Sequence, residues 1–337
     1  MSTILAPPPS VRIAAPLLDP RETHHRIPGP HAGLRLFLRH LPPAEGAPAA
    51  ATPVLYVHGG TFPSALSIAH RLDERSWRDS LSAAGFHVWG LDFHGFGTLS
   101  DPWPAFAEAA DAHPPLGRTE DASRQLESAV RYIAARHGGA RVALVAHSWG
   151  SLVAGHFAAR CPERVARMVF FGPIAQREPP AAPVALPAWR LISVQDQWDR
   201  FTADVPAGEA PVLSAAHFAA WAERYLDCDP ASRDRTPHAV QVPAGAFQDI
   251  FDAWAGTFPY DPAQVRAPVA VVRGAWDSMC TDADAAWLRA ALCNAAEVTD
   301  VVIPRATHLM HLEAGRTALY HATEAFLRGA RVEPVAP

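Results

Sequence analysis

The sequence predicts an α/β protein built on one mostly parallel, doubly wound sheet. Short apolar runs rich in β-branched residues alternate with longer stretches of helical periodicity, which is typical of β-α-β units. The alternation stops between residues 172 and 261 and then resumes, which indicates an insertion between two parts of a single sheet. A length of 337 residues suits one core that carries such a subdomain.

Five strands and three helices are predicted before the insertion. The strands are expected at Leu34–Leu41, Val54–Val57, Phe86–Leu91, Arg141–Ala146 and Val165–Phe171. The helices are expected at Asp73–Ala84, Thr119–Arg136 and Leu152–Arg160. Thr119 can cap the second helix, and Gly138-Gly139 can end it.

Residues 172–261 form a candidate cap, because prolines and aromatic residues replace the strand pattern there. Helical periodicity is confined to about Ala210–Leu226 and Ala244–Ala255. Beyond the cap we expect strands at Val269–Arg273 and Val298–Ile303, and helices at Asp282–Leu292 and Glu313–Arg328. The chain therefore divides into a Pro-rich segment (1–32), a core (33–171 and 262–330) and a helical cap (172–261).

The composition excludes several classes of protein. A net charge of −5, from 29 basic against 34 acidic residues, leaves no basic stripe for a nucleic acid. No apolar run is long enough to span a membrane, and the N-terminus lacks the pattern of an export signal. We expect a soluble, cytoplasmic protein whose partner is a small molecule. The sequence does not choose between a monomer and a homodimer.

Neither a metal ion nor a cofactor is expected. The four cysteines lack a CxxC spacing and are too few for a disulfide scaffold, so we expect free thiols. The 17 histidines include no HExxH or HxH pattern with a carboxylate nearby.

The segment from Ala146 to Gly150, Ala-His-Ser-Trp-Gly, joins a predicted strand to a predicted helix. A serine on such a sharp turn is held out at the carboxyl edge of the sheet, and the turn needs small residues at both flanking positions. Alternatively, Ser148 only caps the following helix. Two partner motifs that follow in the order Asp, then His, favour Ser148 as a nucleophile.

A serine nucleophile needs an imidazole to accept its proton and a carboxylate to orient that imidazole. His308 follows the last predicted strand and is favoured as the base over His311, which precedes the final helix. Asp277 lies in a short loop after the preceding strand and is favoured as the acid. Asp282 and Asp284 are alternatives, but carboxylates are expected at a helix start for electrostatic reasons alone.

The oxyanion that develops during acyl transfer needs preorganised N–H donors. Trp149 supplies one at the start of a helix. We expect the second from Gly60, with Thr61 as the alternative, because the turn His58-Gly59-Gly60 follows a strand and lets the backbone approach a substrate. An ordinary turn is the competing interpretation of the two glycines.

Together these motifs resemble those of the α/β-hydrolase fold superfamily, in its branch of capped serine esterases, C–C hydrolases and haloperoxidase-like enzymes. The matching motifs are His58-Gly59-Gly60, Asp92 through Gly97, Ala146 through Gly150, Gly274 through Asp277, and His308 through Glu313. The resemblance covers roughly residues 33–330. It implies an eight-stranded sheet, a cap inserted after the sixth strand, and an acyl-enzyme mechanism without a cofactor. The family often has Gly before the histidine, where this chain has Ala306-Thr307.

The predicted function is a serine hydrolase that cleaves a carboxylic ester or related acyl bond of an apolar or aromatic small molecule. The candidate cap is rich in aromatic residues: Trp189, Trp198, Phe201, Phe218, Trp221, Tyr225, Phe247, Phe251 and Trp254. A C–C bond hydrolase, a short-peptide peptidase, an acyltransferase or a perhydrolase could use the same three residues. A ligand receptor that has lost turnover is the alternative from a different class.

Overall fold

The computed structural model describes residues 17–48 and 50–332. Their central sheet has eight strands in the order β1-β2-β4-β3-β5-β6-β9-β10. The strands are β1 (Thr23–Pro28), β2 (Arg35–Leu41), β3 (Val54–Val57), β4 (Val88–Asp92), β5 (Val142–His147), β6 (Val165–Phe171), β9 (Val269–Gly274) and β10 (Val298–Ile303). β2 pairs antiparallel with both β1 and β4, and the remaining pairs are parallel. The predicted α/β class with a mostly parallel sheet is confirmed.

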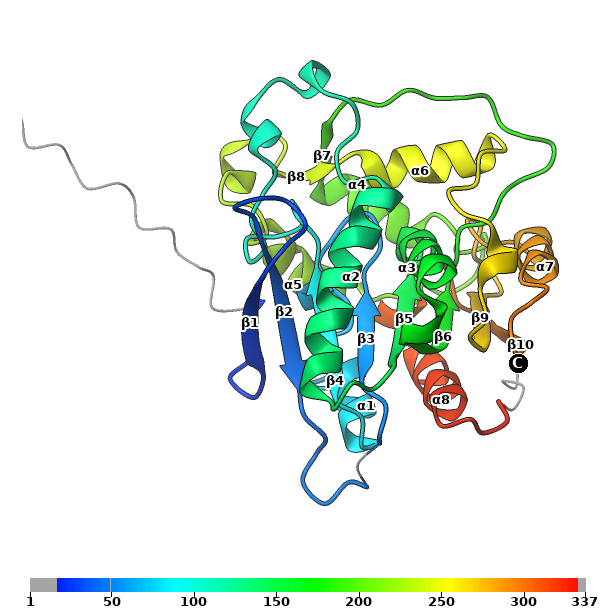
Figure 1. Cartoon of the computed structure of the whole chain (residues 1–337). Coiled ribbons are helices and arrows are strands. Elements are labelled where there is room, and N and C mark those ends of the chain that lie inside the picture. The colour runs from blue at the N-terminus through cyan, green and yellow to red at the C-terminus, as the bar shows by residue number, and fades with distance from the viewer. Residues whose placement is uncertain (1–16, 49, 333–337) are drawn as a thin grey trace, which may run out of the picture.

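Helices cover both faces of the sheet (Figure 1). They are α1 (Trp77–Ala83), α2 (Thr119–Arg136), α3 (Trp149–Arg160), α7 (Asp282–Ala291) and α8 (Arg316–Leu327). Alternate side chains of one strand supply two separate cores. Leu55 and Val57 belong to the core that also contains residues of α2, α3 and α7, whereas Val54 and Tyr56 belong to the core shared with α1 and α8.

Most predicted strands of the sheet are present at or near their expected bounds. Three have the predicted bounds, at 54–57, 165–171 and 298–303, and the others differ by at most two residues at either end. The pattern predicts no strand in residues 1–32, yet β1 lies there and pairs with β2 along its whole length. Only Ile27 of β1 is buried, so this edge strand has almost no apolar periodicity to reveal it.

Two helix starts differ from the sequence expectation. Arg118, rather than Thr119, occupies the N-cap position of α2, and the carboxylate of Asp249 accepts hydrogen bonds from the backbone and hydroxyl of Thr119. The side chain that accepts the free N–H at the start of α2 therefore comes from a residue far away in the sequence. The first helix begins at Trp77 instead of Asp73, because Asp73 has a φ of 52° and a capping box is centred on Ser76.

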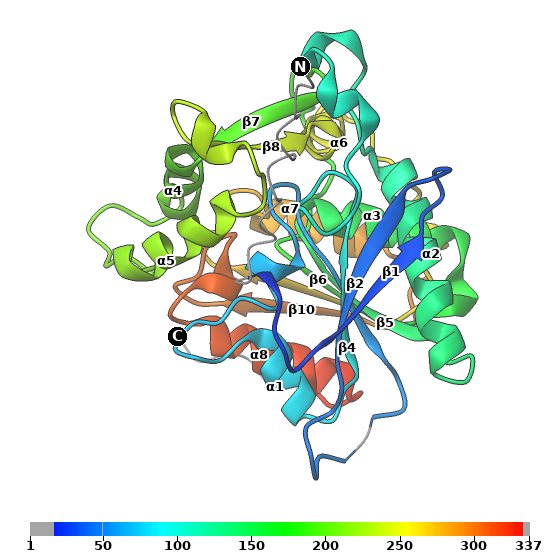
Figure 2. The ribbon, with the colours of Figure 1, turned by 90° about the vertical axis from the view of Figure 1, so that its left-hand side faces the viewer.

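Residues 172–261, called the insertion below, contain β7 (Trp189–Ser193), α4 (Val194–Thr202), α5 (Ala215–Leu226), β8 (Ala239–Pro243) and α6 (Gly245–Trp254). The two predicted helical patches correspond to α5 and α6. The antiparallel pair of β7 and β8, together with α4, is an addition that the sequence pattern does not predict. Figures 1 and 2 show these elements grouped together beyond the carboxyl ends of the parallel strands.

Within the described residues, no helix combines the length and the apolarity needed to cross a bilayer.

Candidate active site

Ser148 lies on the turn that connects β5 to α3. Its φ of 53° and ψ of −126° are unusual for a residue with a Cβ atom. Its N–H donates to the carbonyl oxygen of Phe171 over 3.1 Å, which anchors the turn to the neighbouring strand β6. Ser148 occupies the N-cap position of α3, but its side chain makes no capping hydrogen bond. The Ser148 hydroxyl therefore does not cap α3, contrary to the alternative interpretation of this serine.

Close packing explains the small residue after this turn. A Cβ atom at Gly150 would lie 2.5 Å from the carbonyl oxygen of His58 and 2.7 Å from that of Val57. Because these are backbone atoms, no rotamer change could relieve the clash. The first turn of α3 thus packs directly on the end of β3, where the glycine-containing loop begins.

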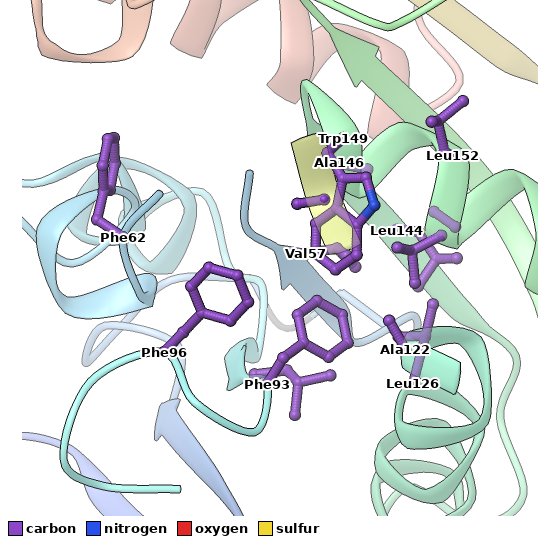
Figure 3. Packing of buried hydrophobic residues seen from close by; sticks show 14 of the residues in the cluster. Val57, Phe62, Phe93, Phe96, Ala122, Leu126, Leu144, Ala146, Trp149 and Leu152 are labelled. Atoms are coloured by element: carbon purple, nitrogen blue, oxygen red, sulfur yellow. The ribbon is translucent and has the colours of Figure 1, made fainter. Parts of the chain in front are cut away.

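The side chain of Trp149 fixes the start of α3. Its indole N–H donates to Asp249 Oδ2 over 2.9 Å, and its ring lies 5.5 Å from that of Phe93, centroid to centroid. Figure 3 shows Trp149 beside Phe93, with Ala122 and Leu126 of α2 nearby. Trp149 is the first residue of α3, so its backbone N–H has no acceptor within the helix. This N–H is the donor expected on the nucleophile side of an oxyanion site.

The predicted base and acid contact each other. His308 Nδ1 lies 3.0 Å from both carboxylate oxygens of Asp277. An N–H at Nδ1 leaves the Nε2 lone pair as the acceptor. The Nε2 atom is buried and has no hydrogen-bond partner among the described residues. Ser148 and His308 line the same cavity, and Asp277 contacts His308 without lining the cavity itself.

Asp277 is held in its charged form. Burial opposes ionisation, but the charge and hydrogen bond of His308 and the backbone N–H of Met279 outweigh it and lower the pKa of Asp277. The N–H groups of Met279 and Cys280 donate to Oδ1 over 2.9 and 3.0 Å. A buried carboxylate with these donors can orient the imidazole and stabilise its protonated form.

The alternative candidates for the acid, Asp284 and Asp282, and for the base, His311, do not contact the His308–Asp277 pair in the way the triad requires. Asp284 forms a capping box with Thr281 at the start of α7, and the side chain of Asp282 is almost fully exposed. His311 is buried against His147, and neither of its ring nitrogens has a hydrogen-bond partner among the described residues. Burial, followed by the neighbouring His308, lowers the pKa of His311 to about 3.

Gly172, directly after β6, was not among the predicted site residues. A Cβ atom there would lie 2.9 Å from His308 Nδ1 and 3.1 Å from Asp277 Oδ2, and the residue has a φ of +51°. The side chains of His308 and Asp277 therefore pack against the backbone of Gly172 at the end of β6, where a side chain would not fit. A glycine that immediately follows a buried strand is the signal that could have indicated this close approach.

Glu313 is a second residue whose role the sequence did not predict. Its carboxylate accepts a bond from the hydroxyl of Thr307 and bonds of 3.1 and 3.3 Å from the Thr307 backbone N–H. The Thr307 hydroxyl in turn accepts from the N–H of Leu309 over 3.2 Å. These bonds fix the loop on both sides of His308. Burial raises the pKa of Glu313 to about 7.

The loop after β3 is anchored by His58. Its Nε2 accepts from the N–H of Phe93 over 3.2 Å, so Nδ1 carries the proton and donates to the carbonyl oxygen of Gly59 over 2.7 Å. Gly59 and Thr61 line the cavity on either side of Gly60. A Cβ atom at Gly60 would lie 2.9 Å from the Cβ atom of Ala246 in α6, so the insertion packs directly on this turn.

The cavity has a volume of about 350 Å³ and is bounded by both the core and the insertion. Its apolar lining consists of Phe62, Ile192, Phe201, Phe247, Ile250, Phe251, Trp254, Met279 and Leu309, among others. Charged residues of the insertion also line it, namely Arg190, Asp196 and Arg200. These were not expected from the sequence, in which the cap stands out for its aromatic residues.

Arg200 lines this cavity and carries a buried donor atom. Its Nη1 atom bonds Asp204 Oδ2 over 3.2 Å, whereas its Nη2 atom is buried and has no hydrogen-bond partner among the described residues. The guanidinium of Arg190 lies over the ring of Phe247, 4.7 Å from its centroid. The carboxylate of Asp196 is engaged by the backbone and hydroxyl of Ser193 in a capping box.

Residues 52–315 match a protein family described as alpha/beta hydrolase fold. No curated protein matches the chain. Solved structures resemble it at low sequence identity, so they bear on the fold alone.

A thermophilic esterase from Thermogutta terrifontis is 19% identical, with a TM-score of 0.55, and the match covers 91% of this chain and 98% of the esterase. A meta-cleavage product hydrolase from Pseudomonas fluorescens IP01 is 14% identical with a TM-score of 0.59 and the same two coverages. A bacterial membrane phospholipase A is 18% identical with a TM-score of 0.57, and the match covers 92% of this chain and 86% of the phospholipase.

Proposed function

This chain belongs to the α/β-hydrolase fold family, and on that basis we propose that it is a serine hydrolase in which Ser148 is the nucleophile. One observation carries the proposal. The strained turn at Ser148 opens on the same cavity as His308, whose distal ring nitrogen is unpartnered among the described residues and whose other nitrogen is bonded to Asp277. This arrangement suits an acyl-transfer reaction with a general base.

In the proposed reaction the Ser148 hydroxyl attacks the carbonyl carbon of an ester while His308 Nε2 accepts the hydroxyl proton. Asp277 stabilises the imidazolium that forms. The N–H groups of Trp149 and Gly60, or of Thr61 in its place, donate to the oxyanion. His308 then protonates the leaving alcohol, which departs from the acyl-enzyme. Water, deprotonated by the same imidazole, attacks the acyl carbon and releases the acid.

We propose that the insertion acts as a cap that selects the substrate. It contributes aromatic and aliphatic side chains to a cavity large enough for a small molecule, which supports an apolar or aromatic substrate. The buried Nη2 atom of Arg200 adds a property of the substrate that the aromatic composition of the cap alone does not suggest. This nitrogen has no hydrogen-bond partner among the described residues and belongs to a side chain that lines the cavity, which supports a substrate that carries a carboxylate or another anionic group.

The test of the nucleophile is labelling by a fluorophosphonate probe together with hydrolysis of p-nitrophenyl butyrate. We expect the wild type to be labelled and to turn over the ester, and Ser148→Ala to lose both properties. Ser128→Ala is the matched control, because Ser128 lies half-buried on α2 and its hydroxyl donates to the carbonyl oxygen of Arg124. Equal labelling of wild type and Ser148→Ala would exclude Ser148 as the nucleophile.

The anionic preference is tested by comparing p-nitrophenyl hemiglutarate with p-nitrophenyl valerate. The wild type should favour the hemiglutarate, and Arg200→Gln should reduce kcat/KM for it about tenfold or more while changing valerate turnover less. Arg131→Gln is the control, since Arg131 is exposed on α2 and pairs with Glu127. An unchanged ratio in Arg200→Gln would refute the anionic preference and leave the role of Ser148 intact.

The same comparison extends to other chemistries. A panel of thioesters, dipeptides and vinylogous 1,5-diketones separates ester cleavage from peptide and C–C bond cleavage, because these reactions share the nucleophile and differ in the group that leaves. The proposed activity stands only if the ester is the best substrate of the panel. The cytoplasmic location expected from the sequence stays a prediction.

A further inference from the structure

Three histidines that are far apart in sequence meet at the sheet edge opposite Ser148. His87 immediately precedes β4, at the amino end of that parallel strand. His40 lies at the same end, because β2 runs antiparallel to β4 and His40 pairs with Trp89. His137 is the C-cap residue of α2. Ser148, in contrast, follows the carboxyl end of β5.

We propose that His40, His87 and His137 form a binding site for a divalent transition-metal ion, with Zn²⁺ as the preferred occupant. One ring nitrogen of each histidine lies within 4.8 Å of the corresponding nitrogens of the other two. His40 Nε2 and His87 Nδ1 are 2.9 Å apart. Tetrahedral Zn²⁺ with Zn–N bonds of about 2.0–2.1 Å places its ligand nitrogens roughly 3.4 Å apart, a spacing between the 2.9 Å of this hydrogen-bonded pair and the 4.8 Å limit of the whole group.

The outer contacts of His40 suit a metal ligand. Its ring stacks on Trp89, with centroids 4.1 Å apart and planes 17° from parallel. Its Nδ1 atom lies 3.3 Å from the hydroxyl oxygen of Thr23. An imidazole that donates from one nitrogen to such a partner directs the lone pair of the other nitrogen at the metal. Here that other nitrogen is the one that faces His87.

The ring of His137 is held beside the same pair. Its centroid lies 4.6 Å from that of His87. The indole N–H of Trp89 donates to its Nε2 atom over 3.2 Å, and an ion bound at this nitrogen would take the place of that donor. Trp89 therefore contacts two of the three histidines. A stacked indole next to the ion also provides an intrinsic fluorescent reporter at the site.

The ligand chemistry selects the class of ion. The group contains three imidazoles and neither a carboxylate nor a thiolate. Imidazole suits Zn²⁺, Cu²⁺ and Ni²⁺, whereas Mg²⁺ and Ca²⁺ require oxygen ligands. All three side chains are half-buried.

A bound ion would join the end of α2 to the β2–β4 edge of the sheet. Because it lies at the opposite edge from Ser148, it would stabilise the fold without entering the hydrolytic reaction. The proposal thus does not depend on the proposed hydrolase activity.

The experiment uses the full chain, freed of any affinity tag and treated with chelator. Isothermal titration with ZnCl₂ should give one ion per chain, and saturation should raise Tm. His87→Gln and His137→Gln should each weaken Zn²⁺ binding about tenfold or more and abolish the rise in Tm. His321→Gln, an exposed histidine on α8, is the matched control and should bind as the wild type does.

A second measurement needs no variant. The wild type loaded with one equivalent of Cu²⁺ should show nitrogen hyperfine splitting in its electron paramagnetic resonance spectrum, together with quenched tryptophan fluorescence. The proposal is overturned if the wild type shows no 1:1 binding, or if folded His87→Gln and His137→Gln bind Zn²⁺ as tightly as the wild type. Loss of Zn²⁺ binding in His321→Gln would show that the ion binds elsewhere, and it would also overturn the proposal.

Discussion

The carboxylate of Asp249 in α6 accepts a 2.9 Å hydrogen bond from the indole nitrogen of Trp149, the residue that follows Ser148. The same Oδ2 atom accepts from the backbone N–H and the hydroxyl of Thr119 over 2.6 and 2.7 Å, and Oδ1 accepts from Arg118. One buried side chain of the insertion thus joins the starts of α2 and α3. Burial raises the pKa of Asp249, partly offset by Arg118.

Replacing Asp249 with Asn should destabilise the protein by about 3 kcal/mol, because the amide NH₂ group cannot accept from the buried donors that face the carboxylate oxygen it replaces. Urea denaturation measures this loss, and ester turnover shows whether the turn at Ser148 moves. Asp252→Asn is the control, since Asp252 contacts the same Arg118 from a more exposed position and should cost about 1 kcal/mol or less. Equal losses in the two variants would contradict a joining role for Asp249.

Asp277→Asn should lower kcat for ester hydrolysis by roughly 10³–10⁴-fold with little change in fold, because an amide cannot hold His308 in the required tautomer or stabilise its charge. Steady-state kinetics on a p-nitrophenyl ester measures the effect. Asp282→Asn, at the exposed alternative position, should retain wild-type activity. If Asp282→Asn were the inactive variant, the assignment of the acid would be wrong.

Gly172→Ala should reduce kcat/KM by about 100-fold or more. The added methyl group would displace His308 from Asp277, since both lie within about 3 Å of its position. Gly208→Ala controls for backbone strain, because Gly208 has a φ of +89° and nothing lies within 4 Å of its Cβ position. That control should lose about 1–2 kcal/mol of stability and keep its activity. Similar activity in both variants would count against the close packing at Gly172.

Glu313 should make stability depend on pH. Its pKa is raised from 4.5 to about 7 by burial, so the folded protein retains a proton that the unfolded chain releases. The contribution of this group to the free energy of unfolding is therefore complete below pH 4.5 and is lost as pH rises through about 7. Glu313→Gln stays neutral and should lack this decline when unfolding is measured between pH 4.5 and 8.

Glu324, which is only partly buried and pairs with Arg328, gives the matched variant for that series. Glu324→Gln should follow the wild-type dependence on pH. A parallel pH profile for wild type and Glu313→Gln would mean that the carboxyl group does not titrate differently in the folded and unfolded chains.

Local sequence patterns were sufficient for most of the sheet. A buried parallel strand such as β3 shows its apolar residues as a continuous run, so its bounds can be read directly. The edge strand β1 buries only Ile27, and β7 and β8 pair only with each other. These strands are stabilised by contacts with distant parts of the chain, which a local pattern of apolar residues does not reveal. The sequence therefore predicts neither a strand in the first 32 residues nor a hairpin in the insertion.

By itself the sequence determined the fold class, the turn at Ser148 and the order in which Ser148, Asp277 and His308 follow three strands. These features depend on short-range demands, namely apolar periodicity and small residues on a sharp turn. Only the tertiary structure decided that Gly172 lies against the His308–Asp277 pair and that Asp249 accepts hydrogen bonds at the starts of α2 and α3, which are far from it in sequence. Such contacts depend on how distant backbones approach each other, and no spacing along the chain encodes that distance.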